Sequence, residues 1–426
     1  MQKSKFYMVM ATRFGVSSFI LDSGERYCLV VDRSTDLPLY YPNLFLTTQL
    51  RNKSDASATI EAAAANLVIL LRFLDRRGID LQERFLKRDF LKVHELDDLR
   101  DFSQRKLGNM SATAAAKSIF SLEELEESAG TVTNGTQYSR LTTIAGYIGW
   151  LAKHLLDSAG ENVIKQIDVM EEQIKARRPS KRGRNNTRNK SLSDEQLETL
   201  FEVIRPKSEF NPFTAYVQRR NRLMVLVLYY LGIRRGELLN IRIRDIDFSK
   251  NQLEIVRRAD EKDDLRSDQP KVKTRSRILP LSDALAKELH EFVAMDRRKI
   301  QNANRHDFLF VTYKAGKTVG QPITIAGYHK VVDVVRSVCP DLYAMTGHKL
   351  RHTWNRKFSE HMDSMGSPPS EERQEQIRSS LQGWKDGSGT ASTYNKRFVE
   401  QKAYEAALSM QETSGIRLPV RVTSDD

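Results

Sequence analysis

The segment from residue 175 to residue 190 constrains the architecture of this chain more than any other. It contains eight basic residues and no acidic residue, and Pro179, Gly183 and repeated asparagines oppose a continuous helix. Periodic apolar patterns, which are typical of packed helices, lie on both sides of it. We therefore expect the 426 residues to form at least two folded domains, joined by a basic linker at 175–190.

The charge of the chain indicates a polyanionic partner. The formal net charge is +13 and the isoelectric point is near 9.5. Clustered Lys and Arg gain affinity for nucleic acids by releasing counterions, although ribosomal and membrane-surface proteins share this bias. A charge run between two domains can also be a solvated hinge, but we favour a segment that crosses a DNA backbone. The linker residues expected to contact DNA are Arg177, Arg178, Lys181, Arg182, Arg184 and Arg188.

Cysteine usage and hydropathy predict a location in the cell. Cys28 and Cys339 are too few and too far apart for a disulfide framework, which fits a reducing compartment. The sequence shows no apolar run that we expect to span a membrane, and residues 1–5 lack the apolar core of a signal peptide. We expect a cytoplasmic protein located at the chromosome.

Residues 1–50 are predicted to form a β-containing extension. Segments 18–21 and 27–31 alternate apolar and polar residues around a turn at 22–24, which predicts a β-hairpin. Such a hairpin is either an accessory module that contacts DNA or protein, or a strap packed on the next domain. The second interpretation is favoured.

Residues 51–174 are predicted to form a helical domain. Its first helix has an apolar stripe along 60–74, with Asp55 or Ser57 as the N-cap and Gly78 as the stop. Two further amphipathic helices are predicted, near 96–107 and at 141–155.

Residues 191–412 are predicted to form a second domain, which is followed by a tail at 413–426. A capping box at Ser193–Gln196 begins its first helix, and 223–231 is a buried helix. The segment 362–380, rich in Ser, Pro and Glu, is interpreted as a long surface connection. Strands are predicted at 253–256, 277–281 and 308–311. The expected fold class is mainly α with a small antiparallel β-sheet, that is, α+β.

An anion-binding site is predicted where two arginines from distant segments meet. Arg234 follows directly on the buried helix, and His348, Arg351 and His352 are spaced i, i+3, i+4. A helix beginning near Lys349 would gather these side chains at its N-terminus, where backbone N–H groups favour an anion. Two guanidinium groups on one phosphate would clamp its non-bridging oxygens.

Tyr394 is the candidate nucleophile of this site. It follows a glycine-rich turn at 387–389, and a tyrosine hydroxyl becomes a covalent nucleophile when neighbouring groups activate it. Tyr404 is the alternative, although its position relative to Trp384 is less favourable. Two histidines one turn apart also suggest zinc, but no third ligand is evident, so we expect no metal site.

Five sequence boxes, in this order, resemble the tyrosine recombinase (phage integrase) family. They are Gly232–Leu238, Lys273 or less favourably Lys271, His348–His352, Gly383-Trp384, and Tyr394. Five boxes in order are more specific than any one of them. The resemblance is strong over 192–408 and looser over 42–156. It implies a helical core-binding domain that grips DNA and a catalytic domain.

The resemblance implies a role for each residue of the site. Four residues would hold the phosphate, a lysine would protonate the leaving 5′ oxygen, and a tyrosine would attack. In that order the expected catalytic residues are Arg234, His348, Arg351, Trp384, Lys273 and Tyr394. Glu237 and His352 are expected to support the site from behind these groups, and Lys271 and Arg275 to contact DNA.

The implied activity is site-specific recombination of double-stranded DNA through a 3′-phosphotyrosyl intermediate, without ATP, metal or other cofactor. Integration or excision of a mobile element is the expected setting. Four protomers would assemble on two duplexes, pass through a Holliday junction, and use accessory DNA-bending or directionality factors, while the segment 395–410 would dock on a neighbouring protomer. The alternatives are an enzyme resembling a type IB topoisomerase or a telomere resolvase, and a catalytically silent DNA-binding regulator.

Overall fold

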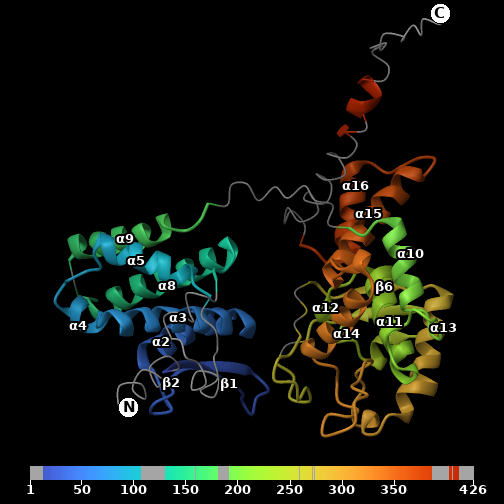
Figure 1. Cartoon of the computed structure of the whole chain (residues 1–426), viewed down its shortest axis with the longest axis horizontal. Helices are drawn as coiled ribbons and strands as arrows, with labels where there is room; N and C mark the ends of the chain where they lie inside the picture. Colours follow the sequence, from blue (N-terminus) through green and yellow to red (C-terminus); the bar gives the residue numbers. More distant parts are fainter. Residues whose placement is uncertain are drawn as a thin grey trace, which may run out of the picture. The chain divides into compact units, whose positions relative to one another are not determined.

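The computed structural model describes residues 13–106, 130–158, 160–180, 191–258, 260–270, 272, 274–385, 403–404 and 406–411. The chain divides into two compact units, Met1–Asn186 and Thr187–Asp426 (Figure 1). Helices dominate both units, and each unit has one three-stranded antiparallel sheet among its described residues. The predicted fold class, mainly α with little antiparallel β-structure, is confirmed.

The N-terminal unit begins with the predicted hairpin. Strand β1 (Phe14–Ile20) pairs antiparallel with β2 (Arg26–Asp32), and the short β3 (Leu37–Pro38) continues the sheet on the other side of β2. The turn is closed by two backbone hydrogen bonds of 2.8 Å, from the Leu21 N–H to the Glu25 carbonyl and from the Gly24 N–H to the Leu21 carbonyl. The hairpin prediction is therefore confirmed.

The helices of this unit follow the apolar stripes of the sequence. The predicted first helix is α3, which ends at Gly78 in the left-handed region (φ 61°), as expected of a helix stop. Its N-cap position is held by Ala56, so the expectation of Asp55 or Ser57 there is wrong. The helices are α2 (Tyr40–Phe45), α3 (Ser57–Arg77), α4 (Leu81–Leu86), α5 (Val93–Gln104), α8 (Asn134–Leu155) and α9 (Glu161–Ala176).

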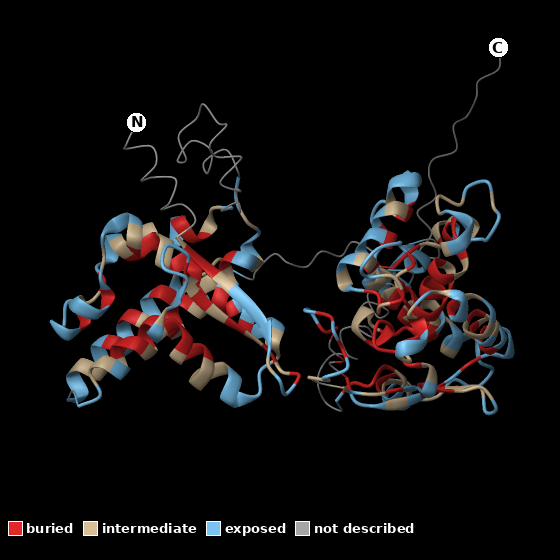
Figure 2. Ribbon diagram, turned by 90° about the horizontal axis from the view of Figure 1, so that it is seen from below, coloured by how far each residue is buried: buried red, intermediate tan, exposed pale blue. Residues whose placement is uncertain are grey.

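Sheet and helices of this unit share one hydrophobic core. Phe14, Cys28 and Val30 of the hairpin are buried in the same cluster as Leu67 of α3 and Ile144 of α8. Figure 2 shows buried residues where the strands meet the helices. The hairpin therefore packs on the helical block, which is the arrangement expected of a strap.

Helix α3 is long and apolar enough to cross a membrane by length and composition, alone among the described helices. The sequence analysis did not anticipate this. Half of its apolar window (50%) is buried within the unit, and a buried core helix passes the same test of length and composition. Its apolar character is therefore explained by the core that it forms with the hairpin and α8.

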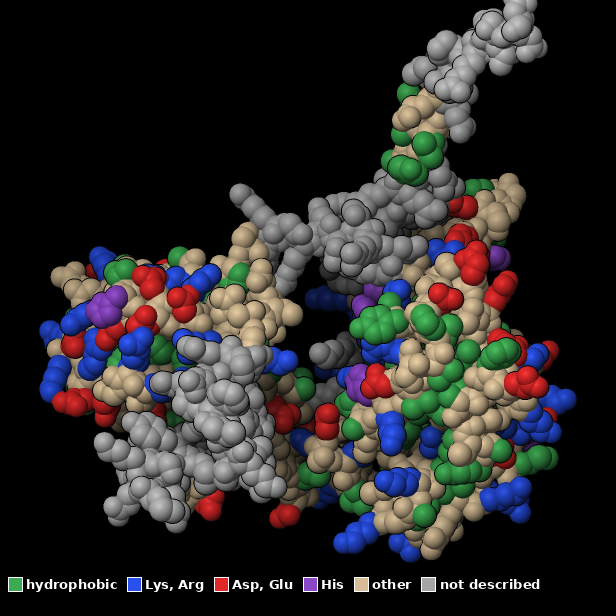
Figure 3. Space-filling model, in the orientation of Figure 1, with side chains coloured by type: hydrophobic (Ala, Val, Ile, Leu, Met, Phe, Trp, Pro, Cys, Tyr) green, Lys and Arg blue, Asp and Glu red, His purple; other side chains and the backbone are tan. Residues whose placement is uncertain are grey.

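Part of the predicted linker is helical. Helix α9 runs to Ala176, and Arg177 follows as its C-cap residue. Residues 181–190, which include Lys181, Arg182, Arg184 and Arg188, lie outside the described residues. On the face drawn in Figure 3, basic side chains are spread over both units and are interspersed with acidic ones.

The C-terminal unit packs its helices around a small sheet and a long buried helix, α11. Strands β4 (Ile246–Asp247), β5 (Gln252–Ile255) and β6 (Arg277–Pro280) pair antiparallel in that order. The capping box predicted at Ser193 is present, with Gln196 as its reciprocal partner. The helices are α10 (Asp194–Val203), α11 (Ala215–Leu231), α12 (Arg235–Leu238), α13 (Asp283–Glu291), α14 (Ile325–Val338), α15 (Gly347–Ser364) and α16 (Glu371–Gln382).

One strand prediction for this unit is wrong. The segment 308–311 is not a strand, although all four residues are buried, because it makes only isolated bridges to Arg242 and Pro322. The third strand of the sheet is β4 instead. The segment 362–380 is mostly exposed, as expected of a surface connection, although α15 extends into it and most of α16 lies within it.

Candidate active site

Arg234 lies just after the C-terminus of the buried helix α11. Gly232 ends this helix in the left-handed region (φ 60°), and Arg234 precedes α12 as its N-cap residue. A Cβ atom on Gly232 would lie 2.7 Å from side-chain atoms of Trp354 and Gln382, so only glycine fits this tight turn. The Arg234 side chain remains 33% exposed, which leaves it accessible at the surface of the unit.

Glu237 is the buried carboxylate beneath Arg234. It accepts a 2.8 Å hydrogen bond from the Arg234 backbone N–H and another from the Thr274 hydroxyl. Two N–H groups of Arg277 donate to it at 3.2 and 3.1 Å. Burial raises the pKa of Glu237, but the charge and hydrogen bonds of Arg277, with the other donors, outweigh burial and hold this pKa below its ordinary value. Glu237 therefore joins the end of α11 to the β5–β6 hairpin as an ionised group.

Arg351 lies one turn into helix α15 and is 1% exposed. Its Nη1 donates to the Gly232 carbonyl at 2.6 Å, and its Nη2 donates to the Gln382 carbonyl at 3.3 Å. Both acceptors are at helix C-termini, where carbonyls lack partners within the helix and favour a cation. The two carbonyls fix the guanidinium between the ends of α11 and α16.

His348 lies in the first turn of α15 and His352 one turn later. Thr346 caps this helix by accepting from the Lys349 N–H at 3.1 Å, and the helix begins at Gly347, two residues before the predicted start. The two imidazole rings pack edge to face with their centroids 4.4 Å apart. His348 is exposed and His352 is half-buried. Within the described residues, no three side chains of His, Cys, Asp or Glu form a cluster suited to a metal ion.

Trp384 follows directly on the C-terminus of α16. Gly383 ends the helix in the left-handed region (φ 64°), and a Cβ atom there would lie 2.9 Å from the Arg275 carbonyl oxygen. The Arg275 N–H donates to the Gly383 carbonyl at 3.0 Å, and Arg277 Nε donates to the Leu381 carbonyl at 2.6 Å. The β5–β6 hairpin therefore packs on the end of α16. Trp384 is 5% exposed, and the Arg351 guanidinium lies 5.5 Å from its ring centroid.

Comparison with known proteins indicates which family the C-terminal unit resembles. The family model described as "Phage integrase family" matches residues 190–399, which include all five sequence boxes. Residues 190–399 are therefore similar to the phage integrase family. This similarity supports the predicted resemblance to tyrosine recombinases.

The similar curated proteins are tyrosine recombinases. "Tyrosine recombinase XerC" of Staphylococcus aureus (strain USA300) is 26% identical over 174 residues, which is 41% of this chain and 48% of that protein. XerC of Staphylococcus saprophyticus has the same identity and coverage. The chain therefore spans about half the length of the curated relatives it matches.

Solved integrase and recombinase structures also align along most of the chain. A structure of the Tn1549 transposon integrase in complex with transposon right end DNA covers 88% of this chain and 100% of its own, with 13% identity and a TM-score of 0.46. XerH bound to a palindromic difH substrate in a post-cleavage complex covers 87% and 94%, with 14% identity and a TM-score of 0.41.

Within this integrase domain, the structure brings together four predicted site residues from three segments. Arg351 bonds to the Gly232 carbonyl, two residues before Arg234, and lies over Trp384, while His348 is in the first turn of α15, the helix that carries Arg351. Lys273, Lys271 and Tyr394 lie outside the described residues. The alternative nucleophile, Tyr404, is in a helical segment and is 67% exposed.

The linker arginines that the structure describes already have partners. Arg177 Nε donates to Asp97 at 2.7 Å, and its Nη1 donates to the Gln173 carbonyl. The Arg178 guanidinium lies over the ring of Tyr138, with its carbon 4.8 Å from the centroid. These side chains stabilise the end of α9, and their contact with DNA stays a prediction.

Sequence analysis missed Arg277 and Thr274 as site residues. It placed Arg277 in a predicted strand and gave it no role, whereas its side chain is 7% exposed and bonded to Glu237. The alternation of the strand contained the signal, because Arg277 and buried Leu279 are on one face of β6 and exposed Ile278 is on the other. An arginine on the inward face of a strand indicates a buried acidic partner.

Proposed function

We propose that this protein is a site-specific DNA recombinase that cleaves and rejoins duplex DNA through a covalent phosphotyrosyl bond. The observation that carries the proposal is the fixed position of Arg351, between the carbonyls of Gly232 and Gln382 and over Trp384. A buried guanidinium held by two helix ends, one of which leads directly into Arg234, suits an oxyanion whose charge grows in the transition state.

The chemistry is a transesterification in two reversible steps. Tyr394 attacks a phosphodiester, so that a bond forms between its oxygen and phosphorus while the bond to the 5′ oxygen breaks. His348 takes the proton of the tyrosine, and Lys273 gives a proton to the departing 5′ oxygen. A 5′ hydroxyl from a second duplex then reverses the attack, so no external energy source is needed.

Arg234, Arg351 and Trp384 stabilise the charge on the non-bridging oxygens. The guanidinium groups donate in a planar fork, and the indole of Trp384 is a donor only, so it serves as a hydrogen-bond donor and not as a base. Glu237 positions Arg234 from below, since it is bonded to the backbone N–H of that residue. His352 packs on His348 and fixes its ring.

The biological setting follows from the same proposal. The partners are double-stranded DNA with a specific target site, further copies of this chain in a tetramer that forms a Holliday junction, and accessory DNA-bending or directionality factors. Integration or excision of a mobile element in the bacterial cytoplasm, at the nucleoid, is the role that fits best. We propose the same domain boundaries as the sequence predicted. They are an extension at 1–50, a helical domain at 51–174, a linker at 175–190, a catalytic domain at 191–412 and a tail at 413–426.

The test compares two adjacent arginines. Arg234→Ala should abolish covalent attachment to DNA, because the phosphate loses one of its two guanidinium groups. Arg235→Ala is the matched control, since Arg235 bonds to His329 Nε2 at 2.6 Å instead of facing Glu237, and this variant should still cleave. Cleavage by Arg234→Ala equal to that of the unsubstituted protein would contradict the proposal. If the protein relaxed any supercoiled plasmid without requiring a target sequence, its function would be that of a topoisomerase instead.

A further inference from the structure

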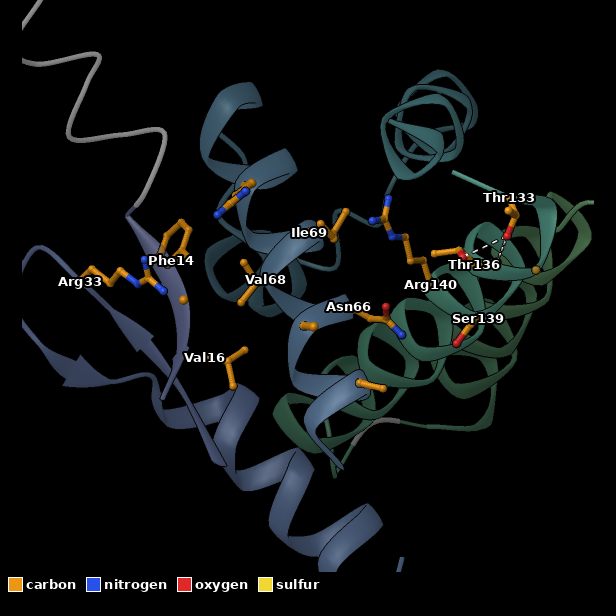
Figure 4. A pocket seen from close by; sticks show the side chains of 15 residues that line it. Phe14, Val16, Arg33, Asn66, Val68, Ile69, Thr133, Thr136, Ser139 and Arg140 are labelled. Carbon is orange, nitrogen blue, oxygen red and sulfur yellow. Dashed lines mark hydrogen bonds between the residues drawn. The ribbon is translucent and has the colours of Figure 1, made fainter. Parts of the chain in front are cut away.

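A cavity of about 700 Å³ lies in the N-terminal unit, between the β1–β2 hairpin, helix α3 and the start of α8 (Figure 4). Among its described lining residues are three arginines, Arg33, Arg72 and Arg140, and no carboxylate. The other polar lining groups are Asn66, Thr133, Thr136 and Ser139. Such a lining favours an anion that accepts several hydrogen bonds.

Helix α8 directs its positive end at this cavity. Thr133 is the N-cap of this 22-residue helix, and its hydroxyl accepts from the Thr136 N–H at 3.3 Å. Arg140 is fixed on the wall of the cavity, because its Nη1 donates to the carbonyls of Ser103 and Arg105, both at 2.8 Å. The helix dipole and the fixed guanidinium act in the same direction, since both stabilise negative charge.

The hairpin contributes Arg33 from the opposite wall. Residue 15 is a glycine, and a Cβ atom there would lie 2.2 Å from Arg33 Nε and 2.7 Å from Arg33 Cζ. The guanidinium therefore occupies the space that a side chain at residue 15 would fill, and lies against the β1 backbone.

Arg33 differs in its ion pairs from Arg13, the residue across the hairpin whose carbonyl accepts from the Arg33 backbone N–H. Arg13 is neutralised by Asp32 at 2.9 Å and Asp75 at 2.7 Å. Arg33 has no ion-pair partner within the part of the chain that the structure describes. A guanidinium placed on a cavity wall without a carboxylate favours a ligand that brings its own negative charge.

We propose that the β1–β2 hairpin forms one wall of a groove for duplex DNA, in which Arg33, held against Gly15, binds a backbone phosphate. This inference rests on the proposed function. It extends DNA binding to the hairpin, which packs on the helical block. A cavity of this volume holds far more than one phosphate group, since a water molecule takes about 30 Å³ in the liquid. The basic lining extends from the hairpin to α8, so it suits a polyanionic backbone better than a single small anion.

The experiment uses two variants that remove the same contact by different means. Arg33→Ala removes the charge. Gly15→Ala keeps every charge but displaces the Arg33 guanidinium, and the strand should tolerate the methyl group because the clash is with the end of a flexible side chain. Lys165→Ala is the control, because Lys165 is exposed on α9, is not among the lining residues, and loses one positive charge likewise.

The probe is labelled duplex DNA of mixed sequence, bound by the full chain at several salt concentrations. Either groove variant should weaken binding about tenfold, the size expected for a hydrogen bond to a charged group. The plot of log affinity against log salt should become less steep by about one unit, as for one lost phosphate contact. The double variant should bind no more weakly than Arg33→Ala, because both changes remove one contact.

The outcomes separate this inference from the proposed function. Groove variants that bind duplex DNA like the Lys165→Ala control, in a protein that still forms the covalent complex, would overturn the groove alone. Displacement of the duplex by inorganic phosphate at constant ionic strength would also overturn it, because it would identify a small-anion site. An unsubstituted protein that neither binds nor cleaves DNA would overturn both.

Discussion

Glu237→Gln is the substitution that probes the buried connection of the active site most sharply. Glu237 accepts from the Arg234 backbone, from Thr274 and from both terminal nitrogens of Arg277. The Glu237 and Arg277 side chains are 0% and 7% exposed, so this ion pair is almost fully removed from water. The glutamine keeps the shape of the side chain but replaces one acceptor oxygen with an N–H donor, which would face Arg277.

The expected loss of stability is large. Removing one partner of a buried ion pair costs about 3–5 kcal/mol, because the remaining charge is left uncompensated. Glutamine retains one acceptor oxygen, and a hydrogen bond to a charged group contributes about 1.5–3 kcal/mol. We therefore expect the C-terminal unit to lose about 2 kcal/mol of unfolding free energy at neutral pH.

The loss should depend on pH in a defined direction. The folded-state pKa of Glu237 is lowered, so the stability that it contributes is complete above its unfolded-state value, near 4.5, and is lost as the pH falls through the folded-state pKa. Glutamine does not titrate. The difference in unfolding free energy between the two proteins should be constant near neutral pH and should shrink on acidification below about pH 4.5.

The assay is urea unfolding followed by tryptophan fluorescence. Trp354 and Trp384 are in the C-terminal unit, and Trp150 is in the N-terminal unit, so a Trp150→Phe background isolates the relevant signal. Glu254→Gln is the control, because Glu254 is exposed on β5, and it should change stability by less than about 0.5 kcal/mol. Equal stability of Glu237→Gln and the control, or a difference that persists unchanged in acid, would refute the argument.

Two further predictions concern single backbone contacts. Gly383→Ala should destabilise the C-terminal unit by about 2 kcal/mol and slow cleavage, because its left-handed conformation and its approach to the Arg275 carbonyl both exclude a Cβ atom; Gly366→Ala, with open space around it, should be neutral in the same urea and cleavage assays. Asn43→Ala should destabilise the N-terminal unit by about 2 kcal/mol, because the buried Asn43 amide bonds both the N–H and the carbonyl of Val30, and urea unfolding that matched the unsubstituted protein would contradict this.

Local chemistry explains the parts of the fold that the sequence predicted well. The reciprocal bonds of Ser193 and Gln196 need only four consecutive residues, and the hairpin at 14–32 needs only alternation and a turn. The stop at Gly232 and the arginine after it are likewise local, because a left-handed glycine ends the helix whatever surrounds it. The position of Arg234 just after the end of this helix was therefore identifiable in advance.

Tertiary contacts explain the errors. The apolar run 308–311 has the composition of a strand, but its backbone bonds individually to Ile241 and Ile323, so no continuous ladder forms. Arg277 resembles its solvated neighbours until the position of Glu237, forty residues earlier, is known. The bonds from Arg351 to the ends of α11 and α16 span 119 and 31 residues, a distance at which local patterns carry no information.

The measurement that tests the central claim most directly is a covalent trap. Purified protein is incubated with fragmented DNA from its host and the flanking element, the mixture is denatured, and DNA fragments attached to tyrosine are recovered and sequenced. We predict recurrent fragment ends with the unsubstituted protein and none with Tyr394→Phe, which should keep its affinity for DNA. Attachment that persists in Tyr394→Phe would name another nucleophile, with Tyr404 first, and DNA binding without attachment in either protein would contradict the phosphotyrosyl mechanism.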